Sequence, residues 1–248
     1  MTERQPPVYI AYHLLWRALD WLFPPTCGGC GRLGFRWCPA CQQAAQRIAG
    51  QVCPTCGLPA MPGGSCPDCT AQRPAFTALR SWGVYGGPLR RAIHRLKYGR
   101  DLGLGEALSK HLIELYNLLQ WNIDCVTPVP LSRRRQQERG YNQAGLLALP
   151  LARAVGAPYR PAALQRTRET RSQVRLGAQE RRANVQGAFR AEPALVSGKH
   201  VLVIDDVTTT GSTIHACAQA LTLAGASAVF GMTLARSVLQ ADADDQPS

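Results

Sequence analysis

Eight cysteines in the first third of the chain have the spacing of metal ligands. They form four pairs with two residues between the thiols: Cys27 and Cys30, Cys38 and Cys41, Cys53 and Cys56, Cys66 and Cys69. Two intervening residues let one tight turn direct both sulfurs to the same ion, and two such turns complete a tetrahedral site. The spacing therefore predicts structural zinc. Sequential quartets (27, 30, 38, 41 and 53, 56, 66, 69) and a cross-braced arrangement both fit it.

Disulfides are the alternative interpretation of these cysteines, and they need an oxidising compartment. The chain begins without a recognisable secretory signal, so we expect a cytoplasmic protein with reduced thiols. Residues 25–72 are rich in Gly and Pro and hold few large apolar side chains. Because such a segment builds little core of its own, the metal would supply its folding energy.

A second stretch whose residue types could form a functional site is VLVIDDVTTTGSTI, residues 201–214. Its four apolar residues predict a strand over 201–204 that is buried on both faces, and a helix is expected over 211–224. Five hydroxyls and a glycine next to a helix N-terminus suit a phosphate monoester. The adjacent carboxylates, Asp205 and Asp206, suit the vicinal hydroxyls of a sugar. The stretch thus predicts a site for a ribose 5-phosphate, and it is not a P-loop because it lacks the GxxxxGK[ST] pattern and contains no lysine.

Alternating patterns in the rest of the chain predict an α/β fold, a doubly wound and mainly parallel sheet, with a small N-terminal Cys-rich module of the zinc-ribbon type. The expected strands are 77–85, 124–129, 201–204 and 228–234, the expected helices are 89–96, 104–119, 141–155 and 211–224, and 160–190 is expected to be a long loop. The predicted organisation is an amphipathic helix in 1–24, a zinc-binding module in 25–72, the α/β domain in 73–240 and a disordered tail in 241–248. The first helix fits packing on the main domain better than a membrane surface, and no apolar run is long enough for a membrane span.

The formal net charge is +12, and 28 residues are Lys or Arg. Residues 131–190 contain 13 Arg against 3 Glu, without Asp or Lys. Arginine grips phosphate through two parallel hydrogen bonds, so this segment favours an anionic ligand, a phosphorylated small molecule or nucleic acid. A general preference of the sequence for Arg over Lys is the alternative explanation. Nucleic-acid binding is less favoured, because single-stranded nucleic acid stacks on aromatic side chains and residues 122–180 contain only two, Tyr141 and Tyr159.

The DDVTTTGST segment after VLVI closely resembles the phosphoribosyl pyrophosphate (PRPP) signature of type I phosphoribosyltransferases. The segments LDWLFPPTCGGC, LKYGRD, PVPLSRRRQQERGYNQA and RRANVQGAF, with the cysteine pairs, resemble the ComF family over nearly the whole chain. The resemblance implies a zinc-binding module joined to a phosphoribosyltransferase domain. It also implies a link to DNA uptake during natural competence.

The resemblance further implies roles for individual residues. Asp205 and Asp206 would hold the ribose hydroxyls, and Val129 and Pro130 belong to a turn that would bind pyrophosphate. Lys97 matches a family lysine that can reach an anion, and Arg139 and Arg181 are the expected catalytic arginines. The expected 5-phosphate loop comprises Thr208, Thr209, Thr210, Gly211, Ser212 and Thr213. Further family-like positions are Tyr141, Asn142, Gln143, Arg166, Gln173 and Asn184.

The same resemblance implies that Mg²⁺ accompanies PRPP and that pyrophosphate leaves as the phosphoribosyl group moves to an acceptor, which the sequence does not name. The alternative is a non-catalytic protein that senses PRPP or handles single-stranded DNA with the competence machinery. Cys125 and Cys217 lie outside the CxxC pairs, and we expect both to be core residues.

Overall fold

The computed structural model describes residues 24–59, 64–168, 185 and 187–237. The helix expected in 1–24, the tail expected in 241–248 and the predicted site residues Gln173, Arg181 and Asn184 lie outside these ranges, apart from Pro24.

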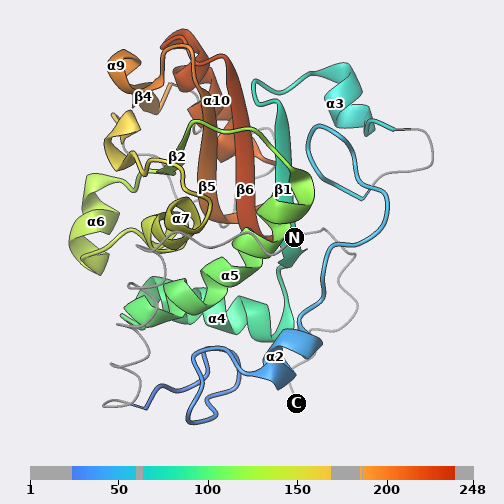
Figure 1. The fold of residues 1–248 in the computed structure, drawn as a ribbon, viewed down its shortest axis with the longest axis vertical. Helices are drawn as coiled ribbons and strands as arrows, with labels where there is room; N and C mark the ends of the chain where they lie inside the picture. The colour runs from blue at the N-terminus through green and yellow to red at the C-terminus, as the bar shows by residue number, and fades with distance from the viewer. Residues whose placement is uncertain (1–23, 60–63, 169–184, 186, 238–248) are drawn as a thin grey trace.

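A four-stranded parallel sheet forms the centre of the molecule (Figure 1). Its strand order is β1 (Ala78–Val84), β6 (Ala228–Arg236), β5 (His200–Thr208) and β2 (Cys125–Pro128). All three neighbouring pairs are parallel. The prediction of a mainly parallel α/β sheet is therefore confirmed, and all four strands end at the same edge.

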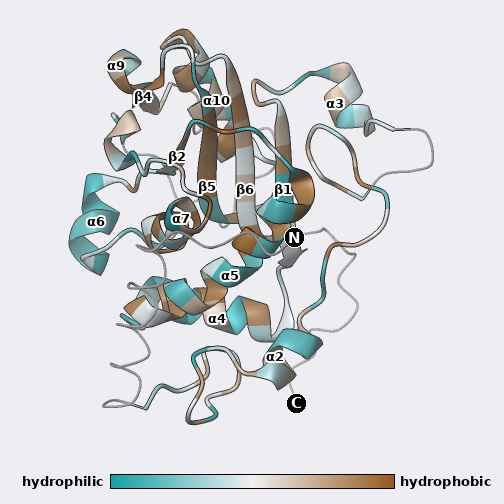
Figure 2. Cartoon of the chain, viewed as in Figure 1, coloured by the Kyte–Doolittle hydropathy of each residue, from teal (hydrophilic) through white to brown (hydrophobic). Residues whose placement is uncertain are grey.

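Helices cover both faces of the sheet because the strand side chains alternate. Along β5, Val201 and Val203 join one apolar cluster, which includes residues of α10 (Ser212–Leu223). Leu202 and Ile204 join the other cluster, with α4 (Gly87–Tyr98), α5 (Leu102–Leu119) and α7 (Gln143–Ala154). The four residues of the apolar run 201–204 are fully buried, as the continuous hydrophobic run predicts. Figure 2 shows this part of β5 in the brown of hydrophobic residues.

Three differences from the predicted elements bear on the site. The strand expected to end at residue 204 continues to Thr208, because the ladder with β6 extends that far. Helix α7 begins at 143 rather than 141, where the Asn142 side chain caps it by accepting from the Ala144 N–H. Helix α6 (Arg133–Arg139) was not expected, since RRRQQER is polar on every face and carries no helical period.

The segment 160–190, expected to be a loop, is partly regular. It contains the 3₁₀ turn η1 (Pro161–Ala163), β3 (Leu164–Arg166) and the start of β4 (Phe189–Ala191), which pairs antiparallel with β3. A short helix, α9 (Pro193–Val196), follows. The two strands are three residues long, too short for an alternating pattern to reveal them.

The cysteine-rich segment forms two small units that pack on different parts of the main domain. The first contains α2 (Pro39–Ala44) and contacts α4 and α5, where Gly28 lies against Leu104 and Ala92. The second contains α3 (Pro67–Ala71) and contacts β1 through a bond from the Leu79 N–H to the Thr55 carbonyl (2.7 Å). Each unit has a tight turn closed by one bridge, Thr26 to Leu33 and Val52 to Pro59.

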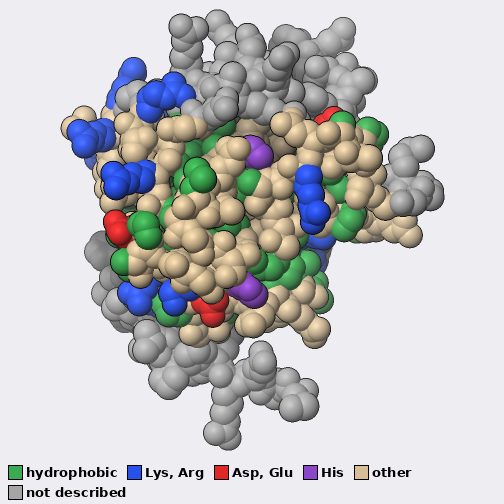
Figure 3. All heavy atoms as spheres, turned by 90° about the horizontal axis from the view of Figure 1, so that it is seen from above, with side chains coloured by type: hydrophobic (Ala, Val, Ile, Leu, Met, Phe, Trp, Pro, Cys, Tyr) green, Lys and Arg blue, Asp and Glu red, His purple; other side chains and the backbone are tan. Residues whose placement is uncertain are grey.

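Basic side chains dominate the charged surface in view in Figure 3, where few Asp and Glu side chains appear among Lys and Arg. Within the described residues, no helix is both long and apolar enough to cross a membrane.

Candidate functional site

The eight paired cysteines gather into two groups of four sulfurs. The first cysteine group is Cys27, Cys30, Cys38 and Cys41, the second cysteine group is Cys53, Cys56, Cys66 and Cys69, and the sulfurs of each lie within 4.8 Å of one another. Sulfur–sulfur distances of 3.7 Å (Cys30 to Cys38) and 3.5 Å (Cys56 to Cys66) are close to the edge of a tetrahedron of four sulfurs around zinc, about 3.8 Å for bonds of about 2.3 Å. The donor sets fit structural zinc, and the pairing is sequential rather than cross-braced.

Backbone N–H groups stabilise thiolates in both groups. Burial works to raise the pKa of Cys27, but the backbone of Cys38 and Gly29 outweighs it and lowers this pKa to about 6. The pKa of Cys53 is likewise lowered to about 6 against the effect of burial, with Cys66 among the backbone donors. Since zinc binds the thiolate, these donors favour the metal-binding form.

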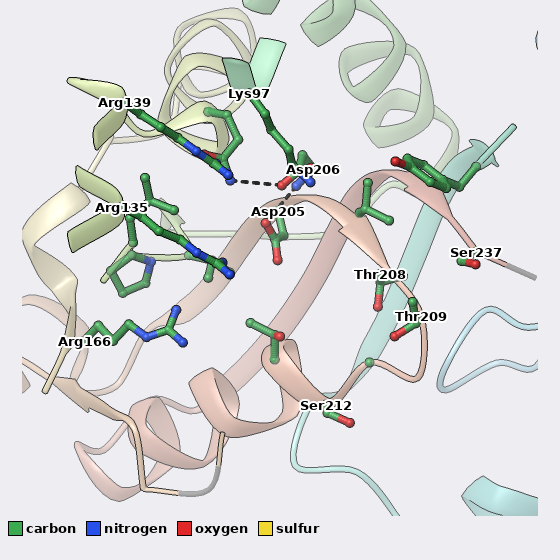
Figure 4. Close-up of a pocket in the computed structure, with 18 of the residues that line it drawn as sticks. Lys97, Arg135, Arg139, Arg166, Asp205, Asp206, Thr208, Thr209, Ser212 and Ser237 are labelled. Atoms are coloured by element: carbon green, nitrogen blue, oxygen red, sulfur yellow. Dashed lines mark hydrogen bonds and ion pairs between the residues drawn. The ribbon is translucent and has the colours of Figure 1, made fainter. Parts of the chain in front are cut away.

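A cavity of about 510 Å³ opens at the edge where all four parallel strands end (Figure 4). Each strand contributes residues at or just after its end: Tyr85 after β1, Val129 and Pro130 after β2, Asp205 to Thr208 in β5, and Ser237 after β6. Ligands of open α/β sheets bind at this edge. The topology therefore brings the two motifs at 128–132 and 205–213 into one site.

Asp206 points to the face of the sheet that α4, α5 and α7 cover, and it forms a closed polar cluster there. Its Oδ2 lies 2.5 Å from Lys97 Nζ on α4, and its Oδ1 accepts from Gln143 Nε2 on α7 (3.1 Å). Burial works to raise the pKa of Asp206, but Lys97 and Gln143 outweigh it, so this pKa is lowered. In turn, burial lowers the pKa of Lys97, and Asp206 raises it above its ordinary value. Asp206 is thus an ionised carboxylate with both oxygens engaged.

Asp205 takes the opposite direction, because successive side chains of a strand alternate. Figure 4 shows it directed into the space that Arg135 and Arg166 also enter, while Asp206 turns towards Lys97. Burial and the neighbouring charge of Asp206 raise the pKa of Asp205 well above its ordinary value. Both carboxylates thus line the cavity inside β5, but their partners differ. Asp206 is engaged by Lys97 and Gln143, and Asp205 accepts only from the Asp206 backbone N–H (2.9 Å) among the hydrogen bonds of the described residues.

The hydroxyl-rich loop after β5 forms one wall of the cavity. Of the six predicted loop residues, five line it: Thr208, Thr209, Gly211, Ser212 and Thr213. Thr210 is outside this lining, and its Oγ1 bonds Ser212 Oγ (2.6 Å). Gly211 has a φ of +81°, a left-handed conformation that glycine adopts without strain. The loop ends at the N-terminus of α10, whose free N–H groups suit an anion.

Lys and Arg side chains line the opposite wall, and the sequence predicted some of these cations. Lys97, Arg139 and Arg166 were expected and line the cavity. Arg90 and Arg135 also line it but were missed, since nothing in a run of similar arginines marks one of them. The Arg139 guanidinium donates to Gln143 Oε1 (2.7 Å) and lies 4.9 Å from the centre of the Tyr98 ring, so it is held next to the Asp206 cluster.

Two residues at the family-like positions of the sequence, Tyr141 and Asn142, hold neighbouring elements of the site in place. Tyr141 donates its hydroxyl to the Leu96 carbonyl (2.7 Å), and Asn142 donates to the Val129 carbonyl (2.9 Å). These bonds fix α4 and the 128–132 turn relative to α7. Cys125 and Cys217 are fully buried, as expected of core residues.

Comparisons with known proteins agree with this architecture. The double zinc ribbon domain matches residues 18–70. The chain is similar to the "DNA utilization protein YhgH" of Escherichia coli O157:H7, at 38% identity over 81% of this chain and 90% of the relative. It is similar to "Competence protein ComFC" of Bacillus subtilis (strain 168), at 29% identity over 90% of this chain and 89% of that protein.

The chain belongs to the ComF family. Among solved structures, this ComF-family chain is similar to the glutamine PRPP amidotransferase of B. subtilis, at 22% identity over 56% of this chain and 30% of that one, with a TM-score of 0.40.

Proposed function

We propose that this ComF-family chain binds PRPP with Mg²⁺ and transfers its phosphoribosyl group to an acceptor, with release of pyrophosphate. The observation that carries the proposal is the arrangement of charge in the cavity. A carboxylate on β5, a hydroxyl and N–H loop leading into α10, and a wall of Lys and Arg side chains surround a space of about 510 Å³. A pentose with an anionic group at each end matches these three surfaces.

Each surface has a distinct role in the proposed reaction. The 208–213 loop binds the 5-phosphate through N–H and hydroxyl donors. Asp205 accepts from the ribose hydroxyls. Arg135, Arg139 and Arg166 attract the pyrophosphate and stabilise the negative charge that grows on it as the C1–O bond breaks. The protein supplies position and electrostatics and needs no covalent nucleophile.

Mg²⁺, when bound with PRPP, would neutralise the leaving group. Of the two adjacent carboxylates, Asp205 fits this role better, because Lys97 and Gln143 occupy the oxygens of Asp206. Asp206 instead positions Lys97 and, through Gln143, Arg139.

Calorimetry with PRPP and Mg²⁺ tests the proposal. We expect Asp205→Asn to weaken binding by about tenfold or more, since the substitution removes a charge-assisted contact worth about 1.5–3 kcal/mol. Glu192→Gln, at an exposed position outside the cavity, is the matched control and should bind like the wild type. Equal binding by Asp205→Asn, or the absence of PRPP binding by the wild type, contradicts the proposal. Pyrophosphate release in a screen of bases, amines and DNA then tests turnover.

A role in DNA uptake is the second candidate, because the names of two relatives refer to competence and to DNA utilization. The net charge of +12 favours polyanions. A gel shift with single-stranded DNA at increasing salt, on wild type and on Asp205→Asn, tests it. Salt-sensitive binding that both proteins share supports a DNA surface separate from the PRPP site, and no shift at low salt contradicts the candidate.

A further inference from the structure

Arg236, the last residue of β6, is a buried cation that has no role in the proposed reaction. Its side chain is 0% exposed, and it does not line the cavity. Among the described residues, no Asp or Glu forms an ion pair with it. A buried charge is costly unless it is paired or hydrogen-bonded, so its partners identify what it holds in place.

Those partners are two backbone carbonyls from separate parts of the site. One guanidinium nitrogen, Nη1, donates to the Thr209 carbonyl in the phosphate loop (3.2 Å). The other, Nη2, donates to the carbonyl of Cys56 in the second cysteine group. A single planar group thus joins the loop to the second cysteine group.

The negative charge that acts on Arg236 also comes from the second cysteine group, where Cys56, Cys66 and Cys69 oppose the lowering of its pKa by burial. Four thiolates around one Zn²⁺ leave a formal charge of two minus. Arg236 binds the carbonyl of Cys56, and Arg80 binds the Pro54 carbonyl in the same turn (2.9 Å). The metal–thiolate cluster therefore takes the place of a carboxylate as the negative charge that balances these two arginines.

Apolar packing connects the same two parts independently of Arg236. Gly211 of the phosphate loop lies against Leu79 and Phe76, and the Leu79 N–H is held by the Thr55 carbonyl of the second unit. In addition, the Ala75 N–H donates to His215 Nδ1 in the first turn of α10 (3.0 Å). The loop thus rests on the segment that leads directly out of the second cysteine group.

The first cysteine group supports a different part of the molecule. Its turn packs on α4 and α5, and Arg91 donates to the Gly29 carbonyl (2.5 Å). Arg91 does not line the cavity. The two groups therefore offer a matched comparison within one chain. Arg91 is bound to a turn of the first group and Arg236 to a turn of the second, but of these two arginines only Arg236 is also bound to the 208–213 loop.

We propose that Arg236 is a positioning residue that makes the order of the phosphate loop depend on metal in the second cysteine group, and that the first group has no such effect. When the second group loses its metal, the carbonyl of Cys56 and the charge opposite the guanidinium are no longer held in place. The Thr209 carbonyl then loses a fixed donor, and the loop that cradles the anion loosens. The proposal rests on the proposed function only for the identity of the anion, PRPP.

The first test compares Arg236→Met with Arg91→Met and reads amide hydrogen exchange in residues 208–213 without ligand. Arg236→Met should speed exchange in this loop by about tenfold, the usual size for loss of a charged hydrogen bond, while Arg91→Met should leave it unchanged. If Arg236→Met fails to fold, Arg236→Lys keeps the charge but loses the two-pronged geometry and should show a smaller increase. Unchanged loop exchange in a folded Arg236 variant overturns the proposal.

The second test removes each metal separately with Cys66→Ser for the second group and Cys30→Ser for the first. Zinc content should fall from two ions to one in both variants. Loop exchange should rise, and PRPP affinity fall by about tenfold, only in Cys66→Ser. Equal effects of both variants overturn the proposal. If the wild type binds no PRPP, the proposed function fails, while the exchange data still decide the role of Arg236.

Discussion

Asp205 and Asp206 are chemically identical neighbours to which the fold gives opposite charge environments. Asp206 is paired with Lys97 and is stabilised as an anion. Asp205 is partly buried beside that anion, and its pKa is raised because burial and the charge of Asp206 both oppose its ionisation. A carboxylate whose ionised form is destabilised inside a cavity is typical of a functional site, where the protein gives up some folding stability for function.

This difference predicts opposite effects of two isosteric substitutions on the ligand-free protein. Asp205→Asn should raise the free energy of unfolding at neutral pH by about 1 kcal/mol, a common gain when a functional site is relaxed. Asp206→Asn should lower it by about 3 kcal/mol, because the partly buried Lys97 is left without its partner. Denaturant unfolding of both variants measures the effects, and two changes of the same sign contradict this account of the pair.

The pH dependence follows from the directions of the shifts. A raised pKa means that Asp205 stabilises the fold only in its protonated form, so its contribution is complete below its ordinary value of 3.8 and is lost as pH rises through the raised pKa. The gain from Asp205→Asn should therefore shrink as pH falls through that range. Asp206 behaves in the reverse way: its contribution is present above 3.8 and is lost only as pH falls through its lowered pKa.

At the scale of elements, the phosphate loop depends on one backbone conformation. Gly211 has a φ of +81°, and a Cβ there would lie 3.3 Å from a Leu79 methyl group. Gly211→Ala should therefore destabilise the protein by about 1 kcal/mol and weaken the proposed PRPP binding, because strain shifts the N–H groups that would face the 5-phosphate. Gly198→Ala is the matched control, since Gly198 has a φ of +70° and no neighbour within 4 Å of the added Cβ. Equal loss of PRPP affinity in both variants would show that the loop is not specifically affected.

The sequence predicted those elements whose burial leaves a pattern. The apolar run at 201–204, the leucine period of α5 and the CxxC pairs each follow from a requirement of the local chain, and the structure forms all three. Helix α6 left no period because no face of it is buried. The Lys97–Asp206 pair joins residues 109 positions apart, and such a contact is set by how α4 packs on the sheet rather than by local sequence.

The site itself shows the same division. The motif at 205–213 predicted the loop and its place at the strand ends, because the order strand, loop and helix fixes both. The different environments of Asp205 and Asp206 could not be predicted, because they depend on the continuation of β5 to Thr208. A strand directs successive side chains to opposite faces. The role of Arg236 could not be predicted, because its burial and its two carbonyl partners, at Thr209 and Cys56, depend on residues distant in the sequence.

At the scale of the whole molecule, metal replaces apolar burial in the N-terminal third. In the described residues 24–59 and 64–72, the buried apolar side chains are five of the cysteines and Ala45. So small a core contributes little to the folding of this segment. Structural zinc contributes folding free energy in its place, about 10–16 kcal/mol per ion.

We therefore expect two zinc ions per chain, and we expect their removal by a chelator to unfold the cysteine-rich segment before the parallel sheet. The sheet has its own two apolar clusters, built largely from β5, β6 and the helices that cover them, so it should keep its secondary structure. Trp37, packed edge-on against His111 (ring centres 6.2 Å apart), should become exposed when the first unit opens. Metal analysis, far-UV circular dichroism and the fluorescence of a Trp37→Phe variant against wild type measure these steps. Complete loss of zinc with unchanged Trp37 emission would show that the first unit folds without its metal.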